Sequence, residues 1–175
     1  MSNPNERAFK PLKIAVMTVS DTRTETTDKS GDTLVKLLTG AGHELAEKRI
    51  VPDDIYQIRA AVSQWVADDS INAVITTGGT GISGRDTTPV AVSALFDKLI
   101  VGFGELFGSV SCVAVNTSTV QSRAGAGGAN ASFLFCLPGS TGACRTGWGK
   151  IISHQLDYRT RPCNLGELMP RVREK

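Results

Sequence analysis

The chain has 175 residues and a mass of 18.5 kDa, the size of one ordinary globular domain, which leaves no room for two large ones. Hydrophobic residues make up 41% and charged residues 21%, a balance that argues against extended disorder. The net charge is only +2, from 19 basic and 17 acidic side chains, so we expect no basic surface that would favour nucleic acid as a partner.

The sequence also lacks the signals of a membrane or secreted protein. No apolar stretch approaches the roughly 20 residues that span a bilayer, and Met1–Lys13 has no apolar core of a signal peptide. The four cysteines follow neither a CxxC pattern nor a dense disulfide framework; their even number permits disulfides, but the lack of a secretory signal favours buried free thiols. We therefore expect a cytoplasmic protein without a membrane partner.

The first predicted element is a buried strand at Lys13–Thr18, an apolar run with β-branched residues. A polar loop, Ser20–Lys29, follows it. Ser30 is placed to cap a helix that ends before Gly42. The segment His43–Val51 predicts a more polar strand near an edge of the sheet.

A second helix is predicted to begin at Pro52 and Asp53, because apolar residues then recur on a single face. The next buried strand is Asn72–Thr77, which leads directly into a glycine-rich loop. Thr88 followed by Pro89 predicts a capped helix that runs towards Ile100.

The signals in the second half of the chain are weaker. We expect Gly102–Gly108 to be irregular, Ser111–Thr119 to form a short element and Ser122–Ala129 to form a helix that glycines end. Ser132–Leu137 predicts the last buried strand. A helix with apolar residues such as Trp148 follows, and then a polar tail.

Strands that alternate with helices predict an α/β fold, in which helices cover both faces of a mainly parallel sheet. We divide the chain into a flexible N-terminal segment (1–11), a single domain (12–157) and a C-terminal tail (158–175). Ligands of such sheets bind beyond the carboxyl ends of the strands. Three loops rich in Gly, Ser, Thr and Asp lie there: Ser20–Ser30, Gly78–Pro89 and Pro138–Arg145.

The segment Gly78, Gly79, Thr80 and Gly81 predicts a phosphate site, because glycines let backbone N–H groups approach an anion closely. The alternative is a tight turn between a strand and a helix. The spacing fits neither a dinucleotide-binding loop nor a P-loop, since Pro89 delays the helix and the Lys and Ser/Thr of a P-loop are missing.

Two acidic residues are candidates for catalysis. Asp86 follows the glycine loop and has no evident structural role, because Thr88 and Pro89 already start the next helix. A carboxylate beside a phosphate is repelled unless a cation lies between them, so Asp86 is our candidate Mg²⁺ ligand. Asp53 is ambiguous on local grounds, since Pro52-Asp53 before an apolar helix also fits an ordinary cap.

The third loop offers a second anion site where a helix begins. One of its two hydroxyls must cap the helix, while the other, the exposed amides and Arg145 face the same edge of the sheet. Ser20 and Asp21 are candidates for the remaining wall, although loops of this composition are usually just solvated. The residues of this last turn are Pro138, Gly139, Ser140 and Thr141.

Eight short motifs occur in a specific order. They are TVSD (Thr18–Asp21), DKSG (Asp28–Gly31), VPDD (Val51–Asp54), TTGGTG (Thr76–Gly81), RDTTP (Arg85–Pro89), GFGE (Gly102–Glu105), SRAGAG (Ser122–Gly127) and LPGS (Leu137–Ser140). Their order and spacing resemble the MoaB/MogA family of molybdenum-cofactor biosynthesis proteins.

The resemblance implies a three-layer α/β fold, a trimer or hexamer and a molybdopterin site. In active members of the family, the terminal phosphate of molybdopterin attacks the α-phosphate of ATP with Mg²⁺, which gives adenylated molybdopterin and pyrophosphate. Asp53 and Asp86 match the two acidic positions that matter in those enzymes. The GGTG and LPGS segments match pterin and phosphate contacts.

Two departures from the family pattern keep a second hypothesis open. Gly139-Ser140-Thr141 stands where adenylylating relatives commonly have PG-x-P, and Val90 stands where an acidic residue is common. The protein is therefore either an Mg-ATP-dependent molybdopterin adenylyltransferase or a non-catalytic molybdopterin-binding or assembly protein of the same pathway. Other molybdenum-cofactor proteins are candidate partners in either case.

Overall fold

The computed structural model describes residues 7–172, and within this range six strands form one sheet in the order β2-β1-β3-β6-β5-β4. The neighbouring strands β2, β1, β3 and β6 are parallel to one another. At the other edge, β5 is antiparallel to β6, and β4 is antiparallel to β5. The strands are β1 (Lys13–Val19), β2 (Glu44–Val51), β3 (Ala73–Thr77), β4 (Lys98–Leu99), β5 (Gly125–Ala129) and β6 (Ser132–Leu137).

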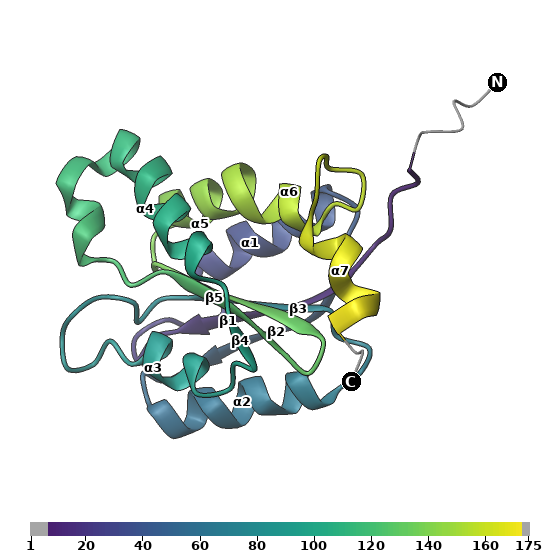
Figure 1. The fold of residues 1–175 in the computed structure, drawn as a ribbon. Coiled ribbons are helices and arrows are strands. Elements are labelled where there is room, and N and C mark those ends of the chain that lie inside the picture. Colours follow the sequence, from purple (N-terminus) through teal and green to yellow (C-terminus); the bar gives the residue numbers. More distant parts are fainter. Residues whose placement is uncertain (1–6, 173–175) are drawn as a thin grey trace.

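Helices cover both faces of this sheet (Figure 1). One face is covered by α1 (Lys29–Gly40), α4 (Val101–Val115) and α5 (Thr141–Gly147), and the other by α2 (Ile55–Ala67) and α3 (Thr88–Ser93). The remaining helical segments are the 3₁₀ helix η1 (Asn116–Gln121), the π-helical η2 (Trp148–Ile152), α6 (Ser153–Leu156) and α7 (Leu165–Val172).

Two hydrophobic cores hold the layers together, because successive side chains of a strand point to opposite faces. Ile14 and Val16 of β1 pack towards α1, whereas Ala15 and Met17 pack towards α2. All four side chains are fully buried. The predicted three-layer α/β fold with a mainly parallel sheet is confirmed.

The prediction of a helix over the glycine-rich segment Ser122–Ala129 is wrong, because Gly125–Ala129 is strand β5. A Cβ atom built on Gly127 would lie 2.3 Å from the ring of Phe96. Glycine is therefore required for close packing under an aromatic ring, and the segment is fully paired with β6.

The segment expected to be irregular, Gly102–Gly108, and the short element expected over Ser111–Thr119 instead lie in the single helix α4 and in η1. Phe103 and Phe107 are buried against the sheet, so tertiary packing outweighs the low helix propensity of the glycines. Helix α3 is also shorter than predicted, since Lys98 and Leu99 before Ile100 form strand β4.

The segments at the two ends of the domain contact each other. An ion pair of 2.8 Å joins Arg7 to Glu167 of α7, a helix that the sequence did not predict in the tail. Phe9 lies against the ring of His43. The flexibility expected of residues 1–11 falls in part on residues 1–6, which lie outside the described residues.

Two expectations about the chemistry of the chain can be compared with the structure directly. All four cysteines lie within the described residues and are free thiols, but only Cys136 and Cys144 are buried as predicted, whereas Cys112 and Cys163 are exposed. Among residues 7–172, no helix combines the length and the apolar character needed to cross a membrane.

Candidate functional site

The three loops that follow β1, β3 and β6 meet at one small pocket. In the parallel register, Thr18 lies beside Thr77 and Thr77 beside Leu137, so these strands end at the same edge of the sheet. The pocket has a volume of about 270 Å³. Its lining consists of Thr18, Val19, Ser20, Thr22, Arg23, Ser30, Thr77, Gly78 and Gly139.

Direct backbone contact between the loops explains two of the glycines. Gly78 has a φ of +100°, and a Cβ atom there would lie 2.3 Å from the carbonyl oxygen of Val19. The Gly78 N–H donates to Leu137 O at 3.0 Å, and a Cβ atom on Gly139 would lie 3.2 Å from Gly78 Cα. Larger residues would push the loops apart and open the pocket.

A buried carboxylate lies behind the pocket wall. Asp28 is fully buried, and its side chain accepts hydrogen bonds from Thr18 Oγ1 at 2.8 Å and Gly31 N at 2.9 Å. Asp28, rather than the predicted Ser30, caps helix α1, while the Ser30 hydroxyl donates to Asp28 at 3.4 Å. Two hydroxyls of the pocket wall, Thr18 and Ser30, are thus held by one carboxylate.

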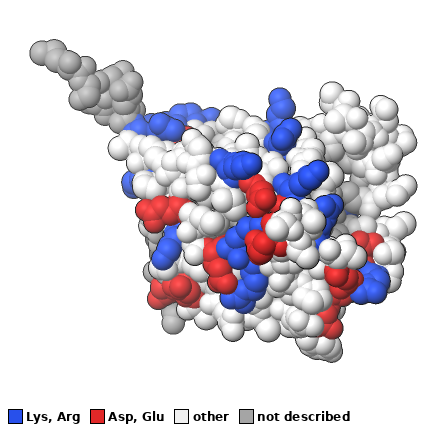
Figure 2. Space-filling model, turned by 180° about the vertical axis from the view of Figure 1, so that it is seen from behind, with Lys and Arg blue, Asp and Glu red and all other residues white. Residues whose placement is uncertain are grey.

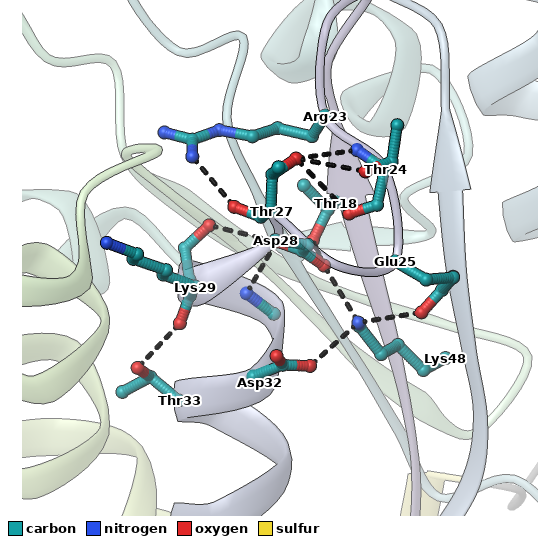
Figure 3. Close-up of polar contacts among 12 residues, drawn as sticks. Thr18, Arg23, Thr24, Glu25, Thr27, Asp28, Lys29, Asp32, Thr33 and Lys48 are labelled. Atoms are coloured by element: carbon teal, nitrogen blue, oxygen red, sulfur yellow. Dashed lines mark hydrogen bonds and ion pairs between the residues drawn. The ribbon is translucent and has the colours of Figure 1, made fainter.

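Lys48 of β2 supplies the counter-charge (Figure 3). Its Nζ lies 3.1 Å from Asp28 Oδ2, 3.0 Å from Glu25 Oε2 and 2.8 Å from Asp32 Oδ1. Burial alone would raise the pKa of Asp28, but hydrogen bonds and Lys48 together hold that pKa below its ordinary value. Asp28 is therefore ionised and its charge is neutralised locally.

Asp53 lies beside the glycine loop and does not cap α2. Asp54 is the cap, because its side chain accepts from the first amides of the helix. Asp53 Oδ1 accepts instead from Thr87 N at 3.2 Å and Thr87 Oγ1 at 2.8 Å. A Cβ atom on Gly79 would lie 3.2 Å from Asp53 Oδ2, so this carboxylate rests against the loop.

Asp86 has a structural role, so the expectation from the sequence that it has none is wrong. Its Oδ2 accepts from Ser83 N at 2.9 Å and from Ser83 Oγ at 2.5 Å. These bonds, a backbone hydrogen bond from Gly81 and the charge of Arg123 hold the pKa of Asp86 below its ordinary value, against the opposing effect of burial. The ionised carboxylate therefore shapes the loop in which it lies.

Two arginines and Asp21 complete this side of the site. Arg85 forms an ion pair with Asp21, whose Oδ1 also accepts from Asp53 N at 3.1 Å. Arg123 Nε donates to Gly81 O at 2.7 Å, and its Nη2 donates to Asp86 O. Sequence reasoning missed Arg123, and the signal that marks it is its position in the SRAGAG motif.

Only Gly139 of the last turn lines this pocket, whereas Pro138 and Ser140 line a second pocket of about 320 Å³ beside α4 and η1. Ser140 Oγ accepts from Ala143 N at 3.1 Å and caps α5, which leaves Thr141 as the second hydroxyl. The carbonyl oxygen of Pro138 accepts from Thr77 Oγ1 at 2.9 Å. Arg145 is exposed on α5 and is not among the residues that line the pocket.

The two carboxylates fit the coordination that Mg²⁺ prefers. Mg²⁺ is usually held by one or two carboxylates together with substrate phosphates. Asp53 keeps Oδ2 outside the hydrogen bonds with Thr87, and Asp86 directly precedes Thr87 in the chain. Within the described part of the chain, no group of three or more His, Cys, Asp or Glu residues is arranged to hold a metal, so an ion here would depend on phosphate oxygens.

The chain is thus a three-layer α/β protein with a polar pocket at the carboxyl ends of its parallel strands, where ligands of such folds bind. Residues 15–158 match the family described as "Probable molybdopterin binding domain", and the chain belongs to this family.

Relatives of known name agree with this assignment. Molybdenum cofactor biosynthesis protein B of Escherichia coli K12 is 50% identical over 156 residues, which cover 89% of this chain and 92% of the relative. The protein of the same name from Bacillus cereus is 44% identical over 156 residues, with the same coverage of both chains. The resemblance inferred from the motifs is therefore confirmed.

Solved structures show the same fold. A crystal structure of a molybdenum cofactor biosynthesis protein B has a TM-score of 0.86 and 40% identity, and the match covers 97% of this chain and 100% of the other. The tungsten cofactor synthesizing protein MoaB from Pyrococcus furiosus has a TM-score of 0.77 and 34% identity, over 95% of this chain and 100% of the other.

Proposed function

We propose that this protein acts in molybdenum cofactor biosynthesis, where it binds molybdopterin and adenylylates it with Mg-ATP. Family membership supports the role in the pathway. The observation that carries the adenylylation proposal is the placement of Asp53 and Asp86 on either side of Thr87, with Asp53 against Gly79 and Asp86 against Gly81. Two carboxylates thus flank a glycine loop at the pocket.

The reaction is a transfer of the adenylyl group between two phosphates. An oxygen of the terminal phosphate of molybdopterin forms a bond to the α-phosphorus of ATP, and the bond from that phosphorus to the bridging oxygen of the β-phosphate breaks. Pyrophosphate leaves with the electron pair of the broken bond. Mg²⁺, when bound, supplies positive charge to the phosphate oxygens.

The residues of this chain bind and orient the reactants in that scheme. Backbone amides of Gly79 and Thr80, and those of the turn that follows Pro138, would hold phosphate oxygens, because the glycines leave them accessible. Asp53 and Asp86 would hold the cation against those oxygens. Fixed amides and charges at the reacting phosphates are the main source of rate in phosphoryl and nucleotidyl transfer.

A non-catalytic molybdopterin-binding or assembly role in the same pathway is the second candidate. The observation that favours it is the engagement of Asp86 with Ser83, which a purely structural residue would also show. The two candidates differ in one measurable product, since only the first releases pyrophosphate.

The test compares the parent protein with Asp86→Asn and Asp54→Asn. We expect the parent to release pyrophosphate from ATP when Mg²⁺ and molybdopterin are present. Asp86→Asn keeps an oxygen that accepts from Ser83, so its free energy of unfolding should fall by less than about 1 kcal/mol. The variant should still bind molybdopterin. Its pyrophosphate release should fall by about a hundredfold, since the charge that holds the cation is removed.

Asp54→Asn is the matched control, because Asp54 is the neighbouring acid of the same motif and Asn also caps helices well. It should retain the activity of the parent. Molybdopterin binding without pyrophosphate release from the parent would favour the second candidate. Absence of molybdopterin binding by the folded parent would contradict both.

A further inference from the structure

We propose that Arg123 is a positioning residue that orients both carboxylates, Asp53 and Asp86, through the backbone of the loop between Thr80 and Thr87. Its relevance to catalysis rests on the proposed function, whereas its effect on the loop does not. Arg123 lies between η1 and β5, outside the segments that line the pocket.

Arg123 contacts three carbonyl groups of this loop. Its backbone N–H donates to Thr80 O at 2.9 Å, its Nε donates to Gly81 O at 2.7 Å, and its Nη2 donates to Asp86 O. The loop lies between β3 and α3 and projects from the body of the molecule (Figure 1). One residue distant in the sequence thus ties together both ends of an irregular segment.

The geometry of the peptide group extends this effect to Asp53. In a planar trans peptide, the C=O of one residue and the N–H of the next point in opposite directions. Arg123 holds the Asp86 carbonyl, so the Thr87 N–H must point to the other side of the loop. There it is shared between Asp53 Oδ1 at 3.2 Å and the carbonyl oxygen of Arg85 at 3.0 Å.

The same reasoning applies to Asp86. Because the Arg123 N–H holds the Thr80 carbonyl, the Gly81 N–H points away from Arg123. On that side lies the Asp86 carboxylate, directly beside the Gly81 peptide. A Cβ atom on Gly81 would lie 2.6 Å from Asp86 Oδ2, which shows how closely the carboxylate rests on this peptide.

An arginine suits this task because its guanidinium presents several N–H donors in one rigid plane. It binds Gly81 O and Asp86 O at the same time, although these residues are separated by four others in the chain. A lysine carries a single ammonium on a flexible stem, so we expect it to replace one of the two contacts at a time.

The first experiment measures amide hydrogen exchange on the full-length protein without ligand. The variants are Arg123→Gln, Arg123→Lys and the control Arg59→Gln. Arg59 also donates to carbonyl groups, those of Ala91 at 3.3 Å and Val90 at 3.4 Å, but it does not contact the loop.

We expect Arg123→Gln to accelerate exchange in residues 81–87 by about tenfold or more, with strand β3 unchanged, because Gly81 O and Asp86 O lose their side-chain donors while the backbone bond to Thr80 O remains. Arg123→Lys should show a smaller acceleration, and Arg59→Gln should leave the loop at the parent rate. Exchange in the loop at the parent rate in Arg123→Gln, or an equal acceleration in the loop and in β3, would overturn the proposal.

The second experiment measures pyrophosphate release with molybdopterin, ATP and Mg²⁺. We expect Arg123→Gln to lower kcat by about a hundredfold with a smaller change in KM. The two carboxylates are misplaced in this variant, while backbone amides still contact the phosphates of the substrates. Arg123→Lys should recover part of the loss. Parent kcat in Arg123→Gln would overturn the positioning role. If the parent itself releases no pyrophosphate, the proposed function fails, and the exchange experiment still decides whether Arg123 orients the loop.

Discussion

Gly79 occupies a position in the site where its backbone conformation and its surroundings both require glycine. Its φ of +62° lies in the left-handed region, and a Cβ atom there would lie 2.3 Å from Thr88 Oγ1. Thr88 N donates to Gly79 O at 3.1 Å, so the two residues are already held together through the backbone. The close approach of Thr88 therefore leaves no room for a side chain at Gly79.

We therefore expect Gly79→Ala to lower the free energy of unfolding by about 1–3 kcal/mol and to weaken molybdopterin binding, because the loop must shift away from Thr88. Urea denaturation and a binding titration measure the two effects. Gly84→Ala is the control within the same loop, since no atom lies within 4 Å of the added Cβ. Equal stability and binding in Gly79→Ala and Gly84→Ala would show that the loop tolerates side chains.

At the scale of elements, one lysine joins the edge strand β2 to the loop after β1 and to helix α1. Lys48 contacts Glu25 of the loop, the helix cap Asp28 and Asp32 in the first turn of α1 (Figure 3). Its side chain is 13% exposed and that of Asp28 is 0% exposed, so the central ion pair is largely shielded from water. The pocket wall depends on this arrangement through Thr18 and Ser30.

Lys48→Met should lower the free energy of unfolding at neutral pH by about 3 kcal/mol, because a buried carboxylate is left without its cation. In the parent, the folded-state pKa of Asp28 lies below its ordinary value of 3.8, so its stabilisation is present above that pH and is lost on acidification. In the variant, the lowering of this pKa by Lys48 is lost, so the pKa of Asp28 is higher than in the parent. The difference in stability between variant and parent should therefore narrow as the pH falls towards 4.

Urea denaturation at several pH values measures this difference, and Lys36→Met on the exposed side of α1 is the control. A constant difference between Lys48→Met and the parent across this pH range would contradict the assignment of the effect to Asp28. A difference of the same size in Lys36→Met would attribute it to net charge rather than to the ion pair.

The elements differ in how well the sequence predicts them. Strands β1, β3 and β6 are apolar runs buried on both faces, and this pattern needs no knowledge of distant contacts. Strand β5 consists of small residues, and its pairing with β6 and its packing under Phe96 decide its conformation. Helix α4 likewise depends on the burial of Phe103 and Phe107.

The same distinction holds in the candidate site. The sequence predicts that the three loops lie together, because the ends of parallel strands meet at one edge. It does not show that Asp54 rather than Asp53 caps α2, since either carboxylate suits a cap. Arg123 could not be assigned, because its partners, Gly81 and Asp86, lie about 40 residues earlier and become neighbours only in the fold.

At the scale of the whole molecule, charge is distributed unevenly over the surface. In Figure 2, acidic and basic side chains intermingle over the sheet edge and its helices, while the upper right corner is free of both. Helix α4 and η1 lie at this corner, and residues 106–122 contain no charged side chain. Of the residues of α4, all of which are described, Phe103, Phe107 and Ser111 are buried.

Apart from Glu105, α4 has no charged side chain, and a helix of this apolar character is normally covered over most of its surface. Val113 is 90% exposed and Val120 is 80% exposed, which is unfavourable for two neighbouring apolar residues of a protein that remains monomeric. Since the family resemblance implies a trimer or hexamer, we propose that further copies of this chain cover α4 and η1. The proposal explains a patch that the fold of a single chain leaves exposed.

Light scattering at micromolar concentration should therefore give a mass of three or six times 18.5 kDa. Val113→Glu should reduce this mass, because each copy would bury a charge in an apolar contact without a partner. Tyr56→Glu is the control, since Tyr56 is 74% exposed on α2, on the opposite face of the sheet. An 18.5 kDa species alone in the parent would contradict the assembly. An unchanged mass in Val113→Glu would place the interface elsewhere, and α4 would then need another explanation for its apolar surface.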